Sequence, residues 1–121
     1  MDEAFLEGIR LFNSKRFFDC HEALEALWLK SAGEEKVLLH GLIQIAAAFH
    51  HHQRGNPVGS RSLLEKGWKK LAGFGARRRG IDLNTLRSQL EDWRGYMARQ
   101  AEAAGTSQLT APPLPRIEPS R

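Results

Sequence analysis

The sequence contains 121 residues, which is enough for one domain with a single hydrophobic core but not for two. Its hydrophobic fraction of 41% and charged fraction of 26% are typical of a soluble globular protein, and no run reaches the roughly 18 unbroken apolar residues of a membrane-spanning helix. One cysteine excludes an intramolecular disulfide, and the first residues lack the layout of a signal peptide, so we expect a cytoplasmic protein.

The net charge of +4 hides an uneven distribution of charge along the chain. Residues 1–35 hold four Lys and Arg against eight Asp and Glu, whereas residues 36–80 hold nine against one. Residues 81–121 are balanced, with five of each sign. We therefore expect the acidic and basic segments to complement each other within one fold or between two chains, or the basic segment to attract phosphates.

Two amphipathic helices are predicted in the acidic first part of the chain. Phe5, Ile9 and Phe12 recur at spacings of three and four, which predicts a helix over residues 3–12. A second helix is predicted over residues 16–30, and the glycine that follows shortly after it is typical of a helix C-terminus.

The third predicted helix, residues 34–54, is apolar on nearly every side. Ten of the thirteen residues from Val37 to Phe49 are aliphatic or aromatic. A helix that is hydrophobic all round is usually the buried centre of a bundle. We therefore expect this helix to lie at the centre of the fold.

Two further helices are predicted in the second half. A proline well placed to open a helix stands at the start of residues 57–73. A connector rich in Gly and Arg follows over residues 73–80, and Asp82 or Asn84 can cap a fifth helix that runs to about Ala103. No strand pattern appears in the sequence.

The fold class that follows is all-α, a compact five-helix bundle in residues 1–104 with a C-terminal tail in residues 105–121. Four of the five prolines lie in residues 112–119, where apolar residues are sparse. Such a segment is expected to be extended or disordered, or to lie across a surface.

A histidine and two glutamates stand in the otherwise apolar stretch FFDCHEALEALW, residues 17–28. His21 falls on the apolar face of the second predicted helix, and Glu25 follows four residues later on the same side. We therefore predict that His21 is buried and that Glu25 is at least partly buried. Because buried polar groups need hydrogen-bond partners, Glu25 is expected to accept from one imidazole nitrogen.

Gln44 is predicted to complete this polar cluster from the third helix. It stands in the most apolar run of the chain, where an unpaired amide is costly. Gly41 beside it permits close approach of another backbone. We expect the second and third helices to cross near Gly41, so that His21, Glu25 and Gln44 share one buried polar cluster.

Three interpretations of this cluster remain open: a structural polar core, a metal site, and a site for an organic ligand. The stretch His-Glu-x-x-Glu is similar to a zincin motif in which the second histidine is replaced. In a metal-dependent hydrolase, Glu22 is the candidate base, and the candidate ligands are His21, Glu25 and either His40 or His51. The sequence assigns no metal or cofactor.

Two other features lie near the predicted cluster. Consecutive helical residues point about 100° apart, so the run His50-His51-His52 cannot hold one ion. His40, Gln44, Ala47 and His51 form one stripe of the third helix at spacings of four, three and four. We expect the histidine run to be the solvent-reaching end of this helix, with His51 alone facing back along that stripe. Trp28 lies at the C-terminal end of the helix face that carries His21, and its ring is expected to cover a pocket there.

The basic residues of segment 61–79 are the best candidates for contact with nucleic acid. They include the run Arg77-Arg78-Arg79 but lack interleaved exposed aromatic residues and a recognised reading motif. A solvated connector is the favoured interpretation, and weak nucleic-acid binding stays an alternative.

These motifs together resemble a small all-helical family of prokaryotes and plastids, known as domain of unknown function 309. The resemblance covers roughly residues 3–72 and rests on F-x-x-x-H-E-x-x-E-x-x-W followed by G-L-I-Q-x-A-A-A, in that order. It implies a compact helical bundle and carries no activity with it. The positions that match the family's signature are His21, Glu22, Glu25, Trp28, Gln44 and His50.

The expected function is a non-catalytic binding or interaction role for a cytoplasmic protein, with a homodimer and an unidentified small ligand as partners and no membrane. The alternatives are the metal-dependent hydrolase and weak nucleic-acid binding through residues 61–79. The candidate polar site comprises His21, Glu22, Glu25, Trp28, Gln44, His50 and His51.

Overall fold

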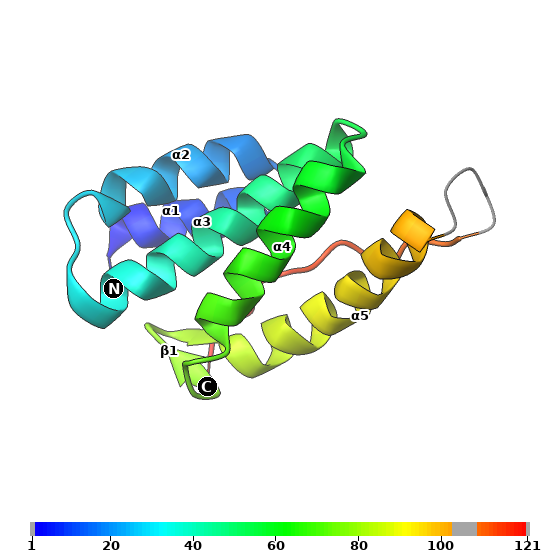
Figure 1. Ribbon diagram of the computed structural model, residues 1–121. Coiled ribbons are helices and arrows are strands. Elements are labelled where there is room, and N and C mark those ends of the chain that lie inside the picture. The colour runs from blue at the N-terminus through cyan, green and yellow to red at the C-terminus, as the bar shows by residue number, and fades with distance from the viewer. Residues whose placement is uncertain (1, 103–108, 121) are drawn as a thin grey trace.

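The computed structural model describes residues 2–102 and 109–120, and five helices account for most of this part of the chain (Figure 1). The predicted all-α bundle is confirmed, and each helix end lies within about two residues of its predicted position. The helices are α1 (Glu3–Asn13), α2 (Phe17–Trp28), α3 (Gly33–Gln53), α4 (Pro57–Leu71) and α5 (Leu83–Glu102).

Helix α3 is the centre of the bundle, as its all-round apolar sequence predicts. α2 and α4 pack on it, α1 packs on α2, and α5 packs on α4. Its buried residues lie on all sides of the helix and include Leu38, Leu42, Ile45 and Phe49. Among the described residues, no helix has both the length and the apolar character needed to cross a membrane.

Two glycines set the distance between α3 and α4. A Cβ atom added at Gly67 would lie 2.9 Å from the carbonyl oxygen of Gly41 and 2.7 Å from Cδ1 of Ile45. We expected Gly41 to serve the crossing with α2, and this prediction is wrong. The Cα of Gly41 instead faces α4, where an added Cβ would lie 3.1 Å from Cδ2 of Leu71.

The connector between α4 and α5 contains a small hairpin that the sequence analysis missed. Strands β1 (Arg77–Arg78) and β2 (Ile81–Asp82) pair antiparallel, with Arg78 opposite Ile81. The two turn residues, Arg79 and Gly80, both have positive φ, 54° and 79°. Two consecutive residues with positive φ are typical of tight two-residue hairpin turns, for which Asn-Gly is the usual sequence signal. The pair Arg-Gly is not such a signal, so the sequence did not predict the turn.

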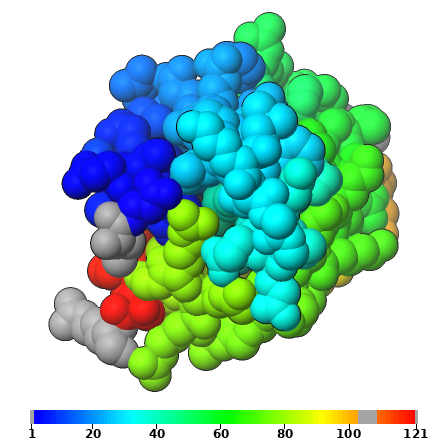
Figure 2. All heavy atoms as spheres, turned by 90° about the vertical axis from the view of Figure 1, so that its left-hand side faces the viewer, coloured from blue at the N-terminus to red at the C-terminus, as the bar shows by residue number. Residues whose placement is uncertain are grey.

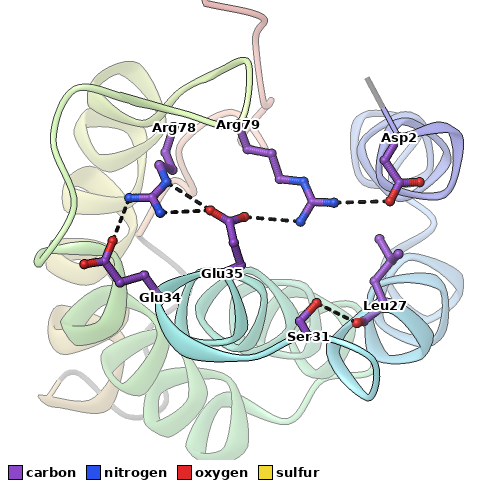
Figure 3. A network of polar contacts seen from close by, with 7 residues as sticks. All are labelled: Asp2, Leu27, Ser31, Glu34, Glu35, Arg78 and Arg79. Atoms are coloured by element: carbon purple, nitrogen blue, oxygen red, sulfur yellow. Dashed lines mark hydrogen bonds and ion pairs between the residues drawn. The ribbon is translucent and has the colours of Figure 1, made fainter.

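The hairpin arginines are held by acidic residues of the first part of the chain (Figure 3). Arg78 contacts Glu34 and Glu35 at 3.0 and 2.9 Å, and Arg79 contacts Glu35 and Asp2 at 3.3 and 3.2 Å. The acidic and basic segments therefore complement each other within one chain. Figure 2 shows this hairpin at the surface, between the N-terminal part of α1 and the start of α3. We call the five residues Asp2, Glu34, Glu35, Arg78 and Arg79 the hairpin network.

The described part of the tail, residues 109–120, is extended and returns along the bundle to the hairpin (Figure 1). Its Ile117 is 1% exposed and belongs to the hydrophobic core. The predicted boundary between bundle and tail, at residues 104 and 105, lies outside the described residues.

Candidate functional site

Four of the seven candidate residues meet around one surface hollow of about 250 Å³ between α2, α3 and α4. The three remaining candidates, Glu22, His50 and His51, do not line it. We call this feature the α3 hollow, because α3 forms its floor. Its lining comprises His21, Glu25, Trp28, His40, Ile43, Gln44, Ala47 and Leu63.

Helix α2 supplies one wall of the α3 hollow through His21, Glu25 and Trp28, which stand three and four residues apart on one face. Nε2 of His21 lies 3.5 Å from Oε2 of Glu25, and their side chains are 30% and 51% exposed. The prediction that this cluster is buried is therefore wrong. The space between α2 and α4 stays open above α3, so these side chains reach water.

Gln44 has a different partner from the one predicted. Its Oε1 accepts a hydrogen bond of 2.9 Å from Nζ of Lys70, on α4. The prediction that it bonds with His21 and Glu25 is wrong, although all three line the same hollow. In the described part of the chain, Nε2 of Gln44 has no hydrogen-bond partner and Lys70 has no carboxylate partner. Lys70 thus orients the amide, and Nε2 of Gln44, unlike Nδ1 of His21, is open to solvent.

His21 also carries unused hydrogen-bonding capacity. Its ring stacks on Phe18 with the centroids 6.1 Å apart, and its Nδ1 is buried without any partner among the described residues. An unsatisfied buried polar atom costs about 1–3 kcal/mol.

His40 and Trp28 form the aromatic end of the α3 hollow. Their ring centroids lie 5.5 Å apart, and Nζ of Lys36 lies 4.6 Å from the indole centroid. Burial and the neighbouring ammonium of Lys70 lower the pKa of His40. At neutral pH its imidazole is therefore uncharged, with one nitrogen that donates and one that accepts.

Two residues of this region were not predicted as members of the polar cluster. His40 was predicted on one stripe with Gln44, Ala47 and His51 and as a candidate metal ligand, and Lys70 as part of the basic segment. The signal for His40 is its place on the stripe with Gln44 and Ala47. Lys70 follows Gly67 by three residues, and because α4 lies close to α3 at Gly67, its ammonium reaches the side chain of Gln44.

The two histidines at the end of α3 have other partners. The ring of His50 lies 5.2 Å from that of Phe18, and Nδ1 of His51 lies 3.2 Å from Nδ2 of Asn56. The prediction that His51 faces back along the stripe of Gln44 is wrong. Burial, followed by the nearby charge of Arg54, lowers the pKa of His50.

The ligand set expected of a metal-dependent hydrolase does not come together. Within residues 2–102 and 109–120, no three side chains of His, Cys, Asp or Glu lie close enough to hold one ion. Glu22, the candidate base, is exposed and lies outside the lining. The zincin-like spacing on α2 gives a pair, with Nε2 of His21 3.5 Å from Oε2 of Glu25.

A larger hollow, of about 510 Å³, lies beside the hairpin and the end of the tail. Arg77, Asp82 and Glu118 are among its lining residues, and none of the candidate residues reaches it. Its volume is larger, but the α3 hollow is the better candidate because Lys70 orients Gln44 there and four of the candidate residues line it.

Comparison with known proteins identifies relatives without assigning an activity. Residues 5–63 match the profile of the family described as Domain of unknown function (DUF309). This segment includes every residue that lines the α3 hollow, whereas Lys70, α5 and the tail lie outside it.

Two curated relatives are both described as uncharacterized. A protein of Aquifex aeolicus (strain VF5) is 30% identical over 112 residues, which is 92% of this chain and 31% of that protein. YpuF of Bacillus subtilis (strain 168) is 34% identical over 64 residues, 51% of this chain and 37% of that protein. The chain thus spans about a third of the length of these relatives.

A solved structure has a similar fold. The crystal structure of a conserved hypothetical protein from Thermus thermophilus matches with a TM-score of 0.66 and 36% identity. The match covers 78% of this chain and 99% of that one. Together, the shared profile and the shared fold confirm the resemblance seen in the two helical motifs: the chain belongs to the family Domain of unknown function (DUF309).

Proposed function

We propose that this chain is a non-catalytic binding protein and that the α3 hollow takes a small zwitterionic molecule of the size of a free amino acid. The observation that carries the proposal is the amide of Gln44, which Lys70 orients while its N–H donors are open to solvent and bond no other described residue. A preoriented group with spare donors binds an acceptor without first breaking a bond of its own.

The size of the hollow supports a small ligand. Its volume of about 250 Å³ is below the roughly 300–1,000 Å³ of pockets that take drug-sized molecules. Ile43, Ala47 and Leu63 give it an apolar floor, which suits a short aliphatic group. The ligand is therefore expected to combine a few carbon atoms with strongly polar ends.

The charges around the hollow support a ligand with one group of each sign. Glu25 on α2 offers a carboxylate, which favours a cationic group. Gln44 offers N–H donors from α3, and the positive charge of Lys70, which bonds Gln44, also favours a carboxylate on the ligand. A zwitterion satisfies both sides, whereas an ion of either sign satisfies one.

The lining supports binding rather than covalent catalysis. The His21–Glu25 pair has no hydroxyl or thiol beside it among the lining residues, so no nucleophile is available for it to activate. Cys20, the single cysteine of the chain, is buried, and burial raises the pKa of its thiol to about 12. An inert thiol is in keeping with a cytoplasmic location, which is part of this proposal.

Calorimetric titration with glycine and alanine, and with acetate and methylammonium as single-charge controls, tests the proposal. We expect the amino acids to bind at least tenfold more tightly than either control. Glu25→Gln and Gln44→Leu should each weaken amino-acid binding about tenfold or more, which corresponds to roughly 1.4 kcal/mol.

Glu22→Gln is the matched control, since it makes the same chemical change three residues away on α2 and outside the lining. It should leave binding unchanged. Equal effects of Glu22→Gln and Glu25→Gln, or equal binding of acetate and glycine, would contradict the proposal.

A further inference from the structure

The C-terminal tail occupies a groove formed by the C-terminal end of α1, the hairpin strand β2 and one face of α5. These elements are far apart in sequence, and each of them makes hydrogen bonds to the tail. Figure 1 shows the tail returning along the bundle to the hairpin. In Figure 2 the end of the tail surfaces directly beside the hairpin. We call this feature the tail groove; it lies apart from the α3 hollow and its use does not depend on the proposed ligand.

Two side-chain amides hold consecutive tail residues by their backbone. Nδ2 of Asn13 donates to the carbonyl oxygen of Ile117 at 2.9 Å, and Oδ1 of Asn13 accepts from its N–H at 2.7 Å. Gln89 makes the same pair of bonds with Arg116, at 3.0 and 2.9 Å. An amide that bonds both the N–H and the C=O of one residue imitates a neighbouring β-strand.

Further bonds fix the register at both ends of the segment. Nε1 of Trp93 donates to the carbonyl oxygen of Pro113 at 2.9 Å. At the other end, the tail forms an isolated antiparallel bridge to β2, with Pro119 opposite Ile81, and the N–H of Asp82 donates to the carbonyl of Glu118 at 2.8 Å. The N–H of Ser120 donates to the carbonyl of Gly80 at 2.9 Å.

The side-chain anchors of the tail are apolar. Ile117 is 1% exposed and packs in the hydrophobic core, and Pro115 is also buried. Prolines favour an extended backbone before binding, so less conformational entropy is lost when such a segment docks. The groove therefore combines backbone bonds, which give affinity, with one buried aliphatic anchor, which gives specificity.

We propose that the tail groove is a docking site for an extended proline-rich segment, and that the segment it takes from outside is residues 113–120 of a second copy of this chain. Every bond and anchor described above is non-covalent, so a tail from another copy makes the same contacts. Reciprocal exchange of this segment builds a dimer at little cost in contact energy.

The chain's own tail competes with this exchange because it is tethered. A short tether gives the tail an effective concentration in the millimolar range. The wild-type chain is therefore expected to be monomeric at micromolar concentration, and the groove becomes open to a partner when its own tail cannot dock.

Two full-length variants with complementary defects test the exchange. Ile117→Asp disables the tail but leaves the groove intact, whereas Asn13→Ala weakens the groove but leaves the tail intact. We expect each variant alone to be monomeric at 50 µM and an equimolar mixture to form a 1:1 heterodimer, measured by native mass spectrometry and sedimentation. Self-association of either variant should be at least tenfold weaker.

In the test mixture, the Asn13→Ala variant supplies the intact tail. In the control mixture it is replaced by the double variant Asn13→Ala/Ile117→Asp, whose tail is also defective. This mixture should form no heterodimer with Ile117→Asp. Circular dichroism establishes that each variant is folded, and Ile117→Ser serves as the tail defect if the aspartate unfolds the chain. A folded mixture that stays monomeric at 1 mM would overturn the proposal. A heterodimer that forms equally well with the double variant would overturn it too, because the contact would then lie elsewhere.

Discussion

The hairpin network and the α3 hollow both gather polar side chains around α3, but they differ in how far those side chains are satisfied. In the hairpin network, each of the two arginines contacts two carboxylates, and Glu35 bridges them. In the α3 hollow, Gln44 keeps two donors unused and Nδ1 of His21 is buried without a partner among the described residues.

Polar groups thus serve structure and function in different ways within one small bundle. Charges that find partners inside the fold help to fix its topology, here by tying the α4–α5 connector to α1 and α3. A buried polar atom without a partner, such as Nδ1 of His21, weakens the fold locally, and our proposal assigns such groups of the α3 hollow to ligand binding.

The largest effect is expected from the contact that places α4 as a wall of the hollow. Gly67→Ala puts a Cβ 2.9 Å from the carbonyl oxygen of Gly41, and the two helices must separate to accept it. We expect a loss of about 1–3 kcal/mol in the free energy of unfolding, measured with urea. Gly73→Ala is the control, since its Cβ meets its first neighbour at 3.7 Å. Equal stability of both variants would contradict a tight crossing.

A smaller loss is expected in the hairpin network, where Glu35 serves two guanidinium groups. Glu35→Ala should lower the free energy of unfolding by about 1–2 kcal/mol, because both arginines lose a charge-assisted hydrogen bond. Glu34→Ala should cost less than about 0.5 kcal/mol, since Glu34 is 75% exposed and contacts Arg78 alone among the described residues. If the two variants cost the same, the bridging role of Glu35 is wrong.

In the α3 hollow, a substitution is expected to leave the free energy of unfolding unchanged or to raise it. His21→Leu removes the unsatisfied Nδ1 and keeps apolar contact with Phe18. We expect the free energy of unfolding to stay constant or to rise by up to about 1 kcal/mol, in thermal or urea unfolding without ligand. Amino-acid binding should be weaker in the same variant. A loss of more than about 1 kcal/mol would show that His21 is a structural group.

The smallest change in the free energy of unfolding is expected when the pH is lowered. Burial lowers the pKa of His52, which packs on Trp93 with the ring centroids 4.9 Å apart, and burial together with Lys70 lowers the pKa of His40. Below the ordinary value of 6.5 the unfolded chain binds more protons than the folded chain. The stability of the folded state is therefore fully present above pH 6.5 and falls as pH drops below it.

Urea unfolding at pH 7.5, 6.5 and 5.5 measures this slope, and His40→Asn and His52→Phe should each reduce it. A stability that is constant or increases on acidification between pH 7.5 and 5.5, or slopes equal to wild type in both variants, would contradict the direction of these pKa shifts.

Much of the fold follows from the spacing of apolar residues. The five helices and the central place of α3 follow from runs such as Val37 to Phe49, because burial of one helix on all sides has a clear sequence pattern. The hairpin does not follow, since its turn is formed by Arg79 and Gly80, and Arg79 adopts a backbone conformation that the residue type does not favour.

The candidate site was predictable in its helices but not in its bonds. The α2 motif and Gln44 lie on adjacent helices, and both line the α3 hollow. The bond between Gln44 and Lys70 joins residues 26 positions apart, and it depends on how closely α4 approaches α3 at Gly67. The same holds for Asn13, whose bonds to Ile117 span 104 positions. No local pattern carries such information.

Side-chain amide signals in ¹⁵N NMR report directly on whether the α3 hollow holds a preoriented amide with unused donors. Gln44 and the two tail-binding amides, Asn13 and Gln89, serve as probe and internal references in one spectrum. On addition of glycine, we expect the Gln44 signal to shift in a saturable manner while the other two stay fixed. A Gln44 signal that does not move, or that moves only in step with Asn13 and Gln89, would refute the proposed role of this amide.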